Sequence, residues 1–207
     1  MEIKSLSPIE DQAPVMPTTL SKRAARIVSS VASPPILTTL LILFSAMETG
    51  GIRMWQWMFM QMSTSLLVPC FYVLYLVKHG KITDLEIYQR RQRYLPNIIF
   101  FACSLVCLVL MLIFNAPIEM IMVAAAGLLL LFVLAVVNYL YKISAHVAAA
   151  SIFAFILWRI MGNALLPGLT LIPLVAWSRL TLHRHTRGQV IAGFIAGAAV
   201  FGVVYLR

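Results

Sequence analysis

Long apolar runs separated by short polar segments are the feature that most constrains how this chain can fold. Along residues 22–207 these runs follow one another with only brief interruptions. A stretch of about 20 apolar residues crosses the hydrocarbon core of a bilayer as a helix, which satisfies its own backbone hydrogen bonds there. With 61% hydrophobic and 11% charged residues, the chain is too apolar for a water-soluble domain. The sequence predicts an all-α, polytopic membrane helix bundle with six to seven transmembrane helices.

The chain divides into a short tail and one membrane domain. Residues 1–21 mix prolines with polar and acidic residues, which predicts a mobile N-terminal tail, and residues 22–207 form a single predicted transmembrane domain. The first predicted span runs to Met47 and is kinked at Pro34–Pro35 or begins there. The later spans are expected at 54–77, in two helices between 96 and 141 that turn at 115–117, from 142–146 to 162–163, around Pro167 and Pro173, and at 190–206. Glycine and alanine are frequent in the last span and permit close helix contact.

Counting the predicted spans places three polar stretches on one face of the membrane. Two spans separate residues 78–93 from 142–146, and two more separate 142–146 from 178–189. Together with the tail, this face carries thirteen of the sixteen Lys and Arg residues. The positive-inside rule makes it the cytoplasmic face. We therefore expect an integral protein of the cell (inner) membrane with its candidate site on the cytoplasmic side.

Charge and cysteine usage exclude several classes of function. The net charge is +9, but the basic residues lie in short segments between apolar runs and form no continuous soluble patch, so nucleic acid is not an expected partner. Cys70, Cys103 and Cys107 lie inside apolar runs, without a Cys-x-x-Cys pair or a nearby histidine, and are expected to pack rather than to bind metal. No metal and no cofactor is predicted, membrane lipids are the expected partners, and the oligomeric state stays open.

Residues 178–189 crowd three arginines and two histidines between two apolar segments. Guanidinium groups suit a phosphate, because their planar donors form paired hydrogen bonds with its oxygens. Histidine adds a nucleophile or proton carrier that works near neutral pH. On a helix His185 and Gln189 lie one turn apart, so that the amide oxygen can accept the imidazole N–H and fix the tautomer. The alternative is a positive interfacial loop that anchors helix ends on anionic lipid.

The three polar stretches together resemble the type 2 phosphatidic acid phosphatase (PAP2) superfamily, whose motifs are Lys-x6-Arg-Pro, Pro-Ser-Gly-His and Ser-Arg-x5-His-x3-Asp. The third motif reads Ser178-Arg179, His185 and then Gln189 in place of aspartate. The second reads Ile-Ser144-Ala-His146. The first is degenerate, with Lys81 nine residues before Arg90 and no unique alignment among Arg90, Arg91 and Arg93. The resemblance covers residues 78–206.

The resemblance implies metal-independent hydrolysis of a lipid phosphate or diphosphate through a phosphohistidine. In that scheme His185 attacks phosphorus, Gln189 orients it, and His146 protonates the leaving lipid oxygen. Phosphate binding falls to Arg179, Ser144 and the cations of the first motif, which are Lys81, Arg90, Arg91 and Arg93. Such chemistry depends on positioning and charge neutralisation, which fixed cations and two imidazoles supply.

Two other interpretations remain from the sequence. Gln189 and the degenerate first motif favour a catalytically weak or inactive relative that binds or carries phospholipid or polyprenyl phosphate. A membrane metalloenzyme using His183, His185 and His146 is a third interpretation, but no His-Glu-x-x-His helix accompanies these residues. The identity of the lipid chain is not encoded in a recognisable motif, because apolar grooves are built from interchangeable residues.

Overall fold

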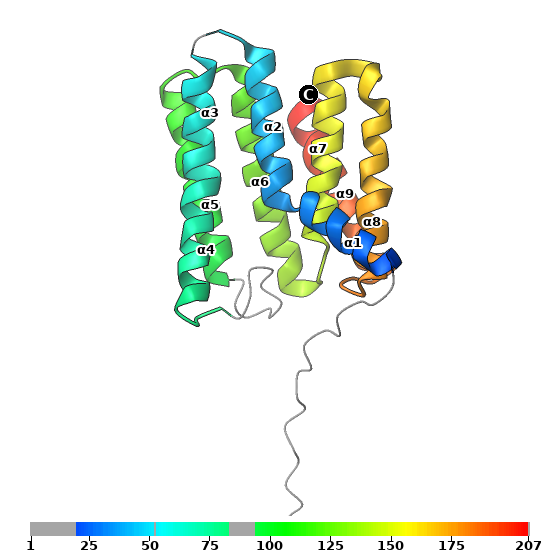
Figure 1. Ribbon diagram of the computed structural model, residues 1–207. Helices are drawn as coiled ribbons and strands as arrows, with labels where there is room; N and C mark the ends of the chain where they lie inside the picture. The colour runs from blue at the N-terminus through cyan, green and yellow to red at the C-terminus, as the bar shows by residue number, and fades with distance from the viewer. Residues whose placement is uncertain (1–19, 52, 83–93, 207) are drawn as a thin grey trace, which may run out of the picture.

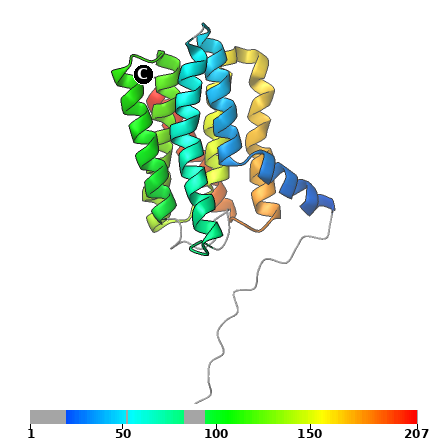
Figure 2. The same ribbon diagram turned by 60° about the vertical axis from the view of Figure 1, so that its left-hand side comes forward.

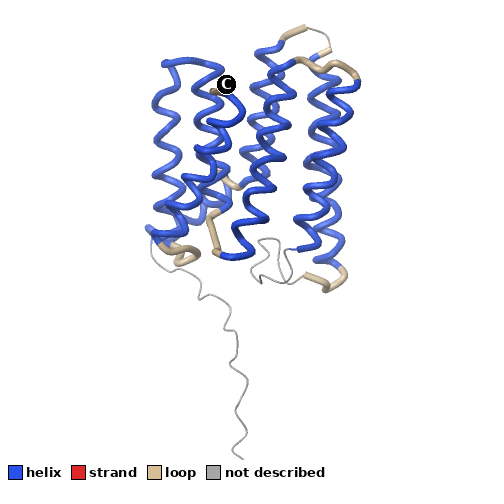
Figure 3. Tube along the Cα trace, turned by 180° about the vertical axis from the view of Figure 1, so that it is seen from behind, coloured by secondary structure: helices blue, strands red, loops and turns tan. Residues whose placement is uncertain are grey.

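The computed structural model describes residues 20–51, 53–82 and 94–206, and this part of the chain is helical with no strand (Figures 1 and 3). The basic residues 90, 91 and 93 lie outside these ranges, as does the predicted tail apart from Leu20 and Ser21, the first two residues of α1. In chain order the elements are α1 (Leu20–Val31), α2 (Pro34–Thr49), α3 (Met54–Met62), η1 (Ser63–Leu67), α4 (Val68–Lys78), α5 (Tyr94–Ile113), α6 (Ile118–Leu140), α7 (Ala145–Met161), η3 (Gly162–Thr170), α8 (Leu171–Thr181) and α9 (Arg187–Tyr205).

The helices form two groups joined by α2 and α6. On one side α3, η1 and α4 follow one another as a single rod beside α5, and α5 packs on α6. On the other side α7 packs against α8 and α9, while α2 contacts both α6 and α7 (Figure 2). The buried core runs through both groups, with Ile42, Met111, Met120 and Ile156 fully enclosed. The predicted all-α bundle is therefore confirmed.

One end of the bundle collects the described parts of all three polar stretches. The chain reaches this end after α4, between α6 and α7, and between α8 and α9 (Figure 1). We call it the motif end. Arg53 precedes α3 and Arg159 lies in the last turn of α7, at the opposite end. The arrangement agrees with the expectation from counting spans that these stretches share a face.

The number of membrane crossings is lower than predicted when helix length is the criterion. Four continuous helical stretches are long and apolar enough to span a membrane, and α1 with α2 makes a fifth if the 48° bend between them lies within one span. The count of six to seven is not confirmed, because α7 has 17 residues and α8 only 11. The segment before α8 is a 3₁₀ helix that contains two glycines and a proline, residues that disfavour a continuous α-helix.

The first predicted span is two separate helices. Pro34 and Pro35 occupy the first turn of α2, where a missing N–H leaves no bond unmade. The preceding helix, α1, is amphipathic and packs obliquely against α8 at the motif end (Figure 1). The prediction of a span that is kinked or begins at the proline pair agrees with these two helices, but α1 begins at Leu20, inside the predicted tail.

Two glycines bring α7 and α9 into close contact. A Cβ atom on Gly193 would lie 2.6 Å from the Ser144 carbonyl oxygen, and one on Gly197 would lie 2.5 Å from the Ala148 carbonyl oxygen. Such distances exclude any side chain, so the two backbones meet as in a small-residue helix interface. The predicted role of small residues in the last span is confirmed, and the contact fixes the start of α7 beside the start of α9.

Candidate functional site

The loop between α8 and α9 holds most of the third motif. Helix α8 ends at Thr181, and His183 takes a left-handed conformation with φ of 53°. The backbone N–H of Arg184 then donates to the Arg179 carbonyl oxygen at 3.1 Å, which closes the turn. His183 is exposed and His185 half-buried. The turn therefore directs the two histidines into different surroundings, and the one at the motif position is the more enclosed.

Gln189 fixes the orientation of His185. Thr186 caps α9, and its hydroxyl accepts from the Gln189 backbone N–H while the Gln189 side-chain oxygen accepts from the Thr186 N–H at 3.3 Å. The same Oε1 atom lies 3.1 Å from Nδ1 of His185. Because this oxygen only accepts, Nδ1 carries the proton and Nε2 keeps its lone pair. A glutamine at this position thus completes a capping box and sets the tautomer that a nucleophilic imidazole requires.

The second motif is hydrogen-bonded to the third. The backbone N–H of Ser144 donates to the Gln189 carbonyl oxygen at 3.1 Å. The Ser144 hydroxyl accepts from the Val147 N–H at 3.4 Å as the N-cap of α7, and the Asn138 side chain accepts from the Ile143 N–H at 3.1 Å. Asn138 was not predicted as part of the site. The start of α7 is therefore held against the start of α9 by main-chain contacts.

His146 lies in the first turn of α7, at the same end as His185. Its imidazole is half-buried. Burial, together with the positive charges of Arg179, His185 and Arg184, lowers the pKa of His146 to about 3. Three positive or potentially positive groups close to one imidazole attract an anion between them, more strongly where water is partly excluded. The prediction that the two motif histidines share one end of the molecule agrees with this geometry.

Arg179 is buried against α1, the helix that precedes the proline pair. Only 5% of its surface is exposed, and its Nη1 donates to the Ser29 hydroxyl of α1 at 2.5 Å. The adjacent Ser178 hydroxyl donates to the Ala25 carbonyl oxygen, also in α1, at 2.7 Å. Ser29 is therefore a contact of the candidate phosphate-binding arginine that motif reasoning missed. The signal available was the small residues Ala25 and Ser29, which lie one turn apart on a helix face.

The described first-motif residue lies apart from this group. Lys81 is exposed, one residue beyond Gly80, in the turn that follows α4. Helix α4 packs on α5 and η1. The other predicted cations, Arg90, Arg91 and Arg93, lie outside the described residues. The structure thus brings Ser144, His146, Arg179, His185 and Gln189 together at the motif end, and Lys81 follows a helix of the other group at the same end.

Within the described ranges, no group of three His, Cys, Asp or Glu side chains has a geometry that could hold a metal ion. The arrangement around His146 and His185 is cationic rather than acidic. Such a set lacks the carboxylates that commonly complete a histidine metal site. It gives the metalloenzyme interpretation no support.

Comparison with known proteins gives one match. The sequence model of the PAP2 superfamily matches residues 138–207, which run from the last turn of α6 to the end of the chain. The predicted resemblance to this superfamily is confirmed over that segment, which holds the second and third motifs. Searches of curated proteins and of solved structures give no match.

Proposed function

We propose, on the premise that residues 138–207 form the PAP2 part of the chain, that this protein is an integral membrane lipid phosphatase. It would hydrolyse a phosphate or diphosphate ester of a lipid, of phospholipid or polyprenyl type, through a phosphohistidine and without a metal. The observation that carries the proposal is the contact between the two motifs. The Ser144 backbone N–H donates to the Gln189 carbonyl oxygen, and the Gln189 side chain accepts a hydrogen bond from His185. The positive charges of Arg179 and His185 act on His146.

The proposed reaction begins with attack on phosphorus by Nε2 of His185. Gln189 accepts the hydrogen bond from Nδ1, which leaves the lone pair of Nε2 available for attack. The new P–N bond forms as the bond from phosphorus to the lipid oxygen breaks. The negative charge of the bound phosphate offsets the neighbouring cations and raises the pKa of His146, which then supplies the proton that the leaving oxygen needs. Water then attacks the phosphohistidine, His146 takes a proton from it, and inorganic phosphate leaves. Each of the two steps inverts the configuration at phosphorus, so His146 and the lipid oxygen must lie on the side of phosphorus opposite His185.

Two helix starts and two arginines supply the positive potential for phosphate. Helices α7 and α9 both begin at the motif end, capped by Ser144 and Thr186. Helix N-termini present free backbone N–H groups and a positive dipole end, which favour an anion. Arg179 and Arg184 add fixed charge near His146. Charge neutralisation of this kind supplies much of the catalysis in phosphoryl transfer.

One observation favours the alternative of a catalytically weak or inactive lipid-phosphate binding protein. Gln189 orients His185 but carries no charge to stabilise the imidazolium that forms during attack. In the serine protease triad, replacement of the orienting acid by an amide lowers turnover about 10⁴-fold, mainly through the wrong tautomer. Here the amide oxygen faces Nδ1, so the tautomer is correct and only the charge is lost. We therefore prefer an active lipid phosphatase to an inactive binding protein.

The proposed site faces the cytoplasm in the cell membrane. The motif end carries Lys22, Arg23 and Arg26 of α1 as well as the site cations. These three residues belong to no phosphatase motif and still place positive charge on the same side, which supports the cytoplasmic orientation under the positive-inside rule.

The test is phosphate release by the purified protein from a panel of lipid monophosphates and diphosphates, with a chelator present. The proposal predicts release by the wild type, and its loss in His185→Ala. The matched control is His183→Ala, because His183 is an exposed histidine two residues away that fills no motif position. Equal loss in both variants, or release that the chelator abolishes, would overturn the phosphohistidine proposal. Binding of lipid phosphate without release in any condition would favour the inactive alternative.

A further inference from the structure

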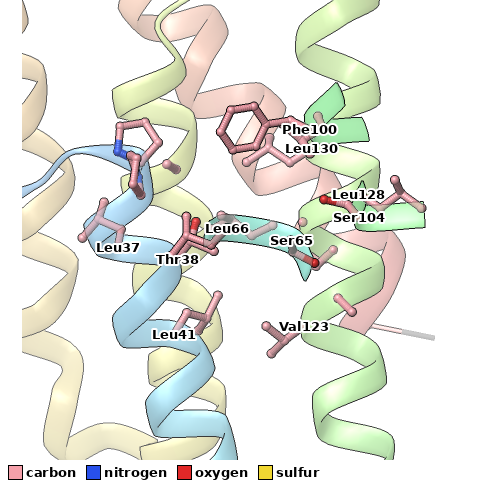
Figure 4. A pocket seen from close by; sticks show the side chains of 18 of the residues that line it. Leu37, Thr38, Leu41, Ser65, Leu66, Phe100, Ser104, Val123, Leu128 and Leu130 are labelled. Atoms are coloured by element: carbon pink, nitrogen blue, oxygen red, sulfur yellow. The ribbon is translucent and has the colours of Figure 1, made fainter. Parts of the chain in front are cut away.

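A cavity of about 270 Å³ lies between α2, η1, α5, α6 and α7. Figure 4 shows side chains of α2 on one side of it, including Leu37 and Leu41, and Phe100, Val123 and Leu130 on the other. Most of the wall is apolar, with a few hydroxyl groups such as Ser65 and Ser104. Cavities that bind small molecules commonly have this composition, an apolar lining with a few placed polar groups.

The cavity runs along the bundle and begins near the motif end. Asn97 and Ala145 line it close to the starts of α5 and α7, and Ala145 is the residue before His146. On α6 the lining extends from Leu134 back to Val123, a length of about 16 Å at 1.5 Å per helical residue. An elongated apolar space therefore starts at the residue before His146 and continues toward the opposite end of the molecule.

A buried glutamine lines the part of the cavity farther from the motif end. Gln61 lies seven residues after the start of α3 at Met54, and only 2% of its surface is exposed. Its Oε1 atom has no hydrogen-bond partner among the described residues. Buried polar atoms without a partner are rare, and each calls for an explanation. At the depth of Gln61 the lining therefore presents an amide, which does not suit a hydrocarbon chain.

We infer that this cavity holds one apolar chain of the lipid phosphate, which enters beside Ala145 and ends at Gln61. The inference rests on the proposed function, because it places the phosphate next to His146. The cavity then selects substrates by chain length. Each methylene that moves from water into the cavity strengthens binding about fourfold. A chain long enough to reach Gln61 gains nothing further, because its end meets an amide rather than apolar side chains.

Substitution of Gly127 tests the inference, because a larger side chain at this position would shorten the cavity. It lies on α6 in the cavity wall, and a Cβ atom placed on it would meet nothing within 4 Å. Gly127→Leu therefore adds an apolar side chain without a backbone clash. The matched control is Gly202→Leu on α9, where an added Cβ would approach only Leu206, at 3.9 Å. Both changes replace a helical glycine with the same residue, so helix propensity is equal in the two variants.

The probe is a series of n-alkyl phosphonates, whose P–C bond resists hydrolysis, with binding measured by calorimetry in nanodiscs and by inhibition of phosphate release. In the wild type and in Gly202→Leu, affinity should rise with chain length and then level off. In Gly127→Leu the plateau should come at shorter chains, with at least tenfold weaker binding of the longest chain and little change for the shortest. Gln61→Leu should move the plateau to longer chains.

The outcomes separate this inference from the proposed function. A length plateau that Gly127→Leu shifts, without hydrolysis of any lipid phosphate, would support the cavity assignment and contradict the phosphatase. Hydrolysis with the same chain-length dependence in the wild type and in Gly127→Leu would overturn the cavity assignment alone. A continuous rise in affinity with no plateau would also overturn it, because it would reflect partition into the bilayer.

Discussion

Replacement of Gln189 by glutamate isolates the one charge by which this site differs from the PAP2 pattern. The side chains are isosteric, and glutamate also completes a capping box with Thr186, so the geometry around His185 should be kept. The oxygen that now faces Nδ1 at 3.1 Å would become part of a carboxylate. Because Nδ1–H gains positive charge as Nε2 attacks phosphorus, the carboxylate should stabilise the transition state more than the ground state.

The size of this effect follows from hydrogen-bond strengths. A neutral hydrogen bond contributes about 0.5–1.5 kcal/mol and one to a charged group about 1.5–3 kcal/mol. The midpoints of the two ranges differ by about 1.25 kcal/mol, which corresponds to close to tenfold in rate. Gln189→Glu should therefore raise kcat about tenfold with little change in KM. Gln189→Leu, which removes the acceptor for both Nδ1 and the Thr186 N–H, should lower kcat by at least about 100-fold.

Steady-state release of inorganic phosphate from the preferred lipid phosphate measures both variants, with thermal unfolding as a check on folding. Glutamate in the first turn of α9 also complements the helix dipole, so Gln189→Glu should unfold no earlier than the wild type. The reasoning is refuted if Gln189→Glu is no faster than the wild type while Gln189→Leu keeps full activity. That result would mean that Gln189 caps α9 and has no role in orienting His185.

Two further predictions concern how the site is held. Ser29→Ala removes the acceptor of a buried Arg179 N–H, which should cost about 1–3 kcal/mol of stability. Thermal unfolding should show this loss, whereas Ser30→Ala, at an exposed neighbour on α1, should match the wild type; equal unfolding temperatures for both would argue against the contact. Gly197→Leu places a Cβ 2.5 Å from the Ala148 carbonyl oxygen and should separate α7 from α9. Size-exclusion chromatography should then show loss of the folded peak, and a normal peak with normal activity would count against the close helix contact.

The sequence was informative wherever a local rule decides the structure. Apolar run length predicted the helices, the proline pair predicted a kink or a helix start where α2 begins, and the small residues of the last span predicted a close helix contact. The spacing of His185 and Gln189 predicted their hydrogen bond, because residues four apart on a helix turn face each other. The common end of His146 and His185 followed from counting alternate crossings. Each of these inferences needed only periodicity, residue type and connectivity.

What the sequence did not reveal depends on contacts between distant segments. The hydrogen bond from Arg179 to Ser29 joins residues 150 positions apart, and the small residues at 25 and 29 do not by themselves identify this partner. Helix α1 is short and carries Lys22, Arg23 and Arg26, so it looked like the flank of a membrane span rather than a separate amphipathic helix. The sequence also did not predict how short α8 is. Apolar composition is the same for a run that is α-helical throughout and for one that begins as a 3₁₀ helix.

The most direct test of the account is detection of a phosphoryl group on His185 during turnover. Base quenching followed by mass spectrometry should find an acid-labile phosphohistidine at His185 in the wild type and none in His185→Ala. In His146→Ala its formation should be slow from a lipid phosphate but near normal from an aryl phosphate, whose leaving group needs no proton. Phosphate release without any phosphoryl group on His185, or equal slowing of both substrates in His146→Ala, would contradict the assignment of these two histidines to opposite sides of one phosphorus atom.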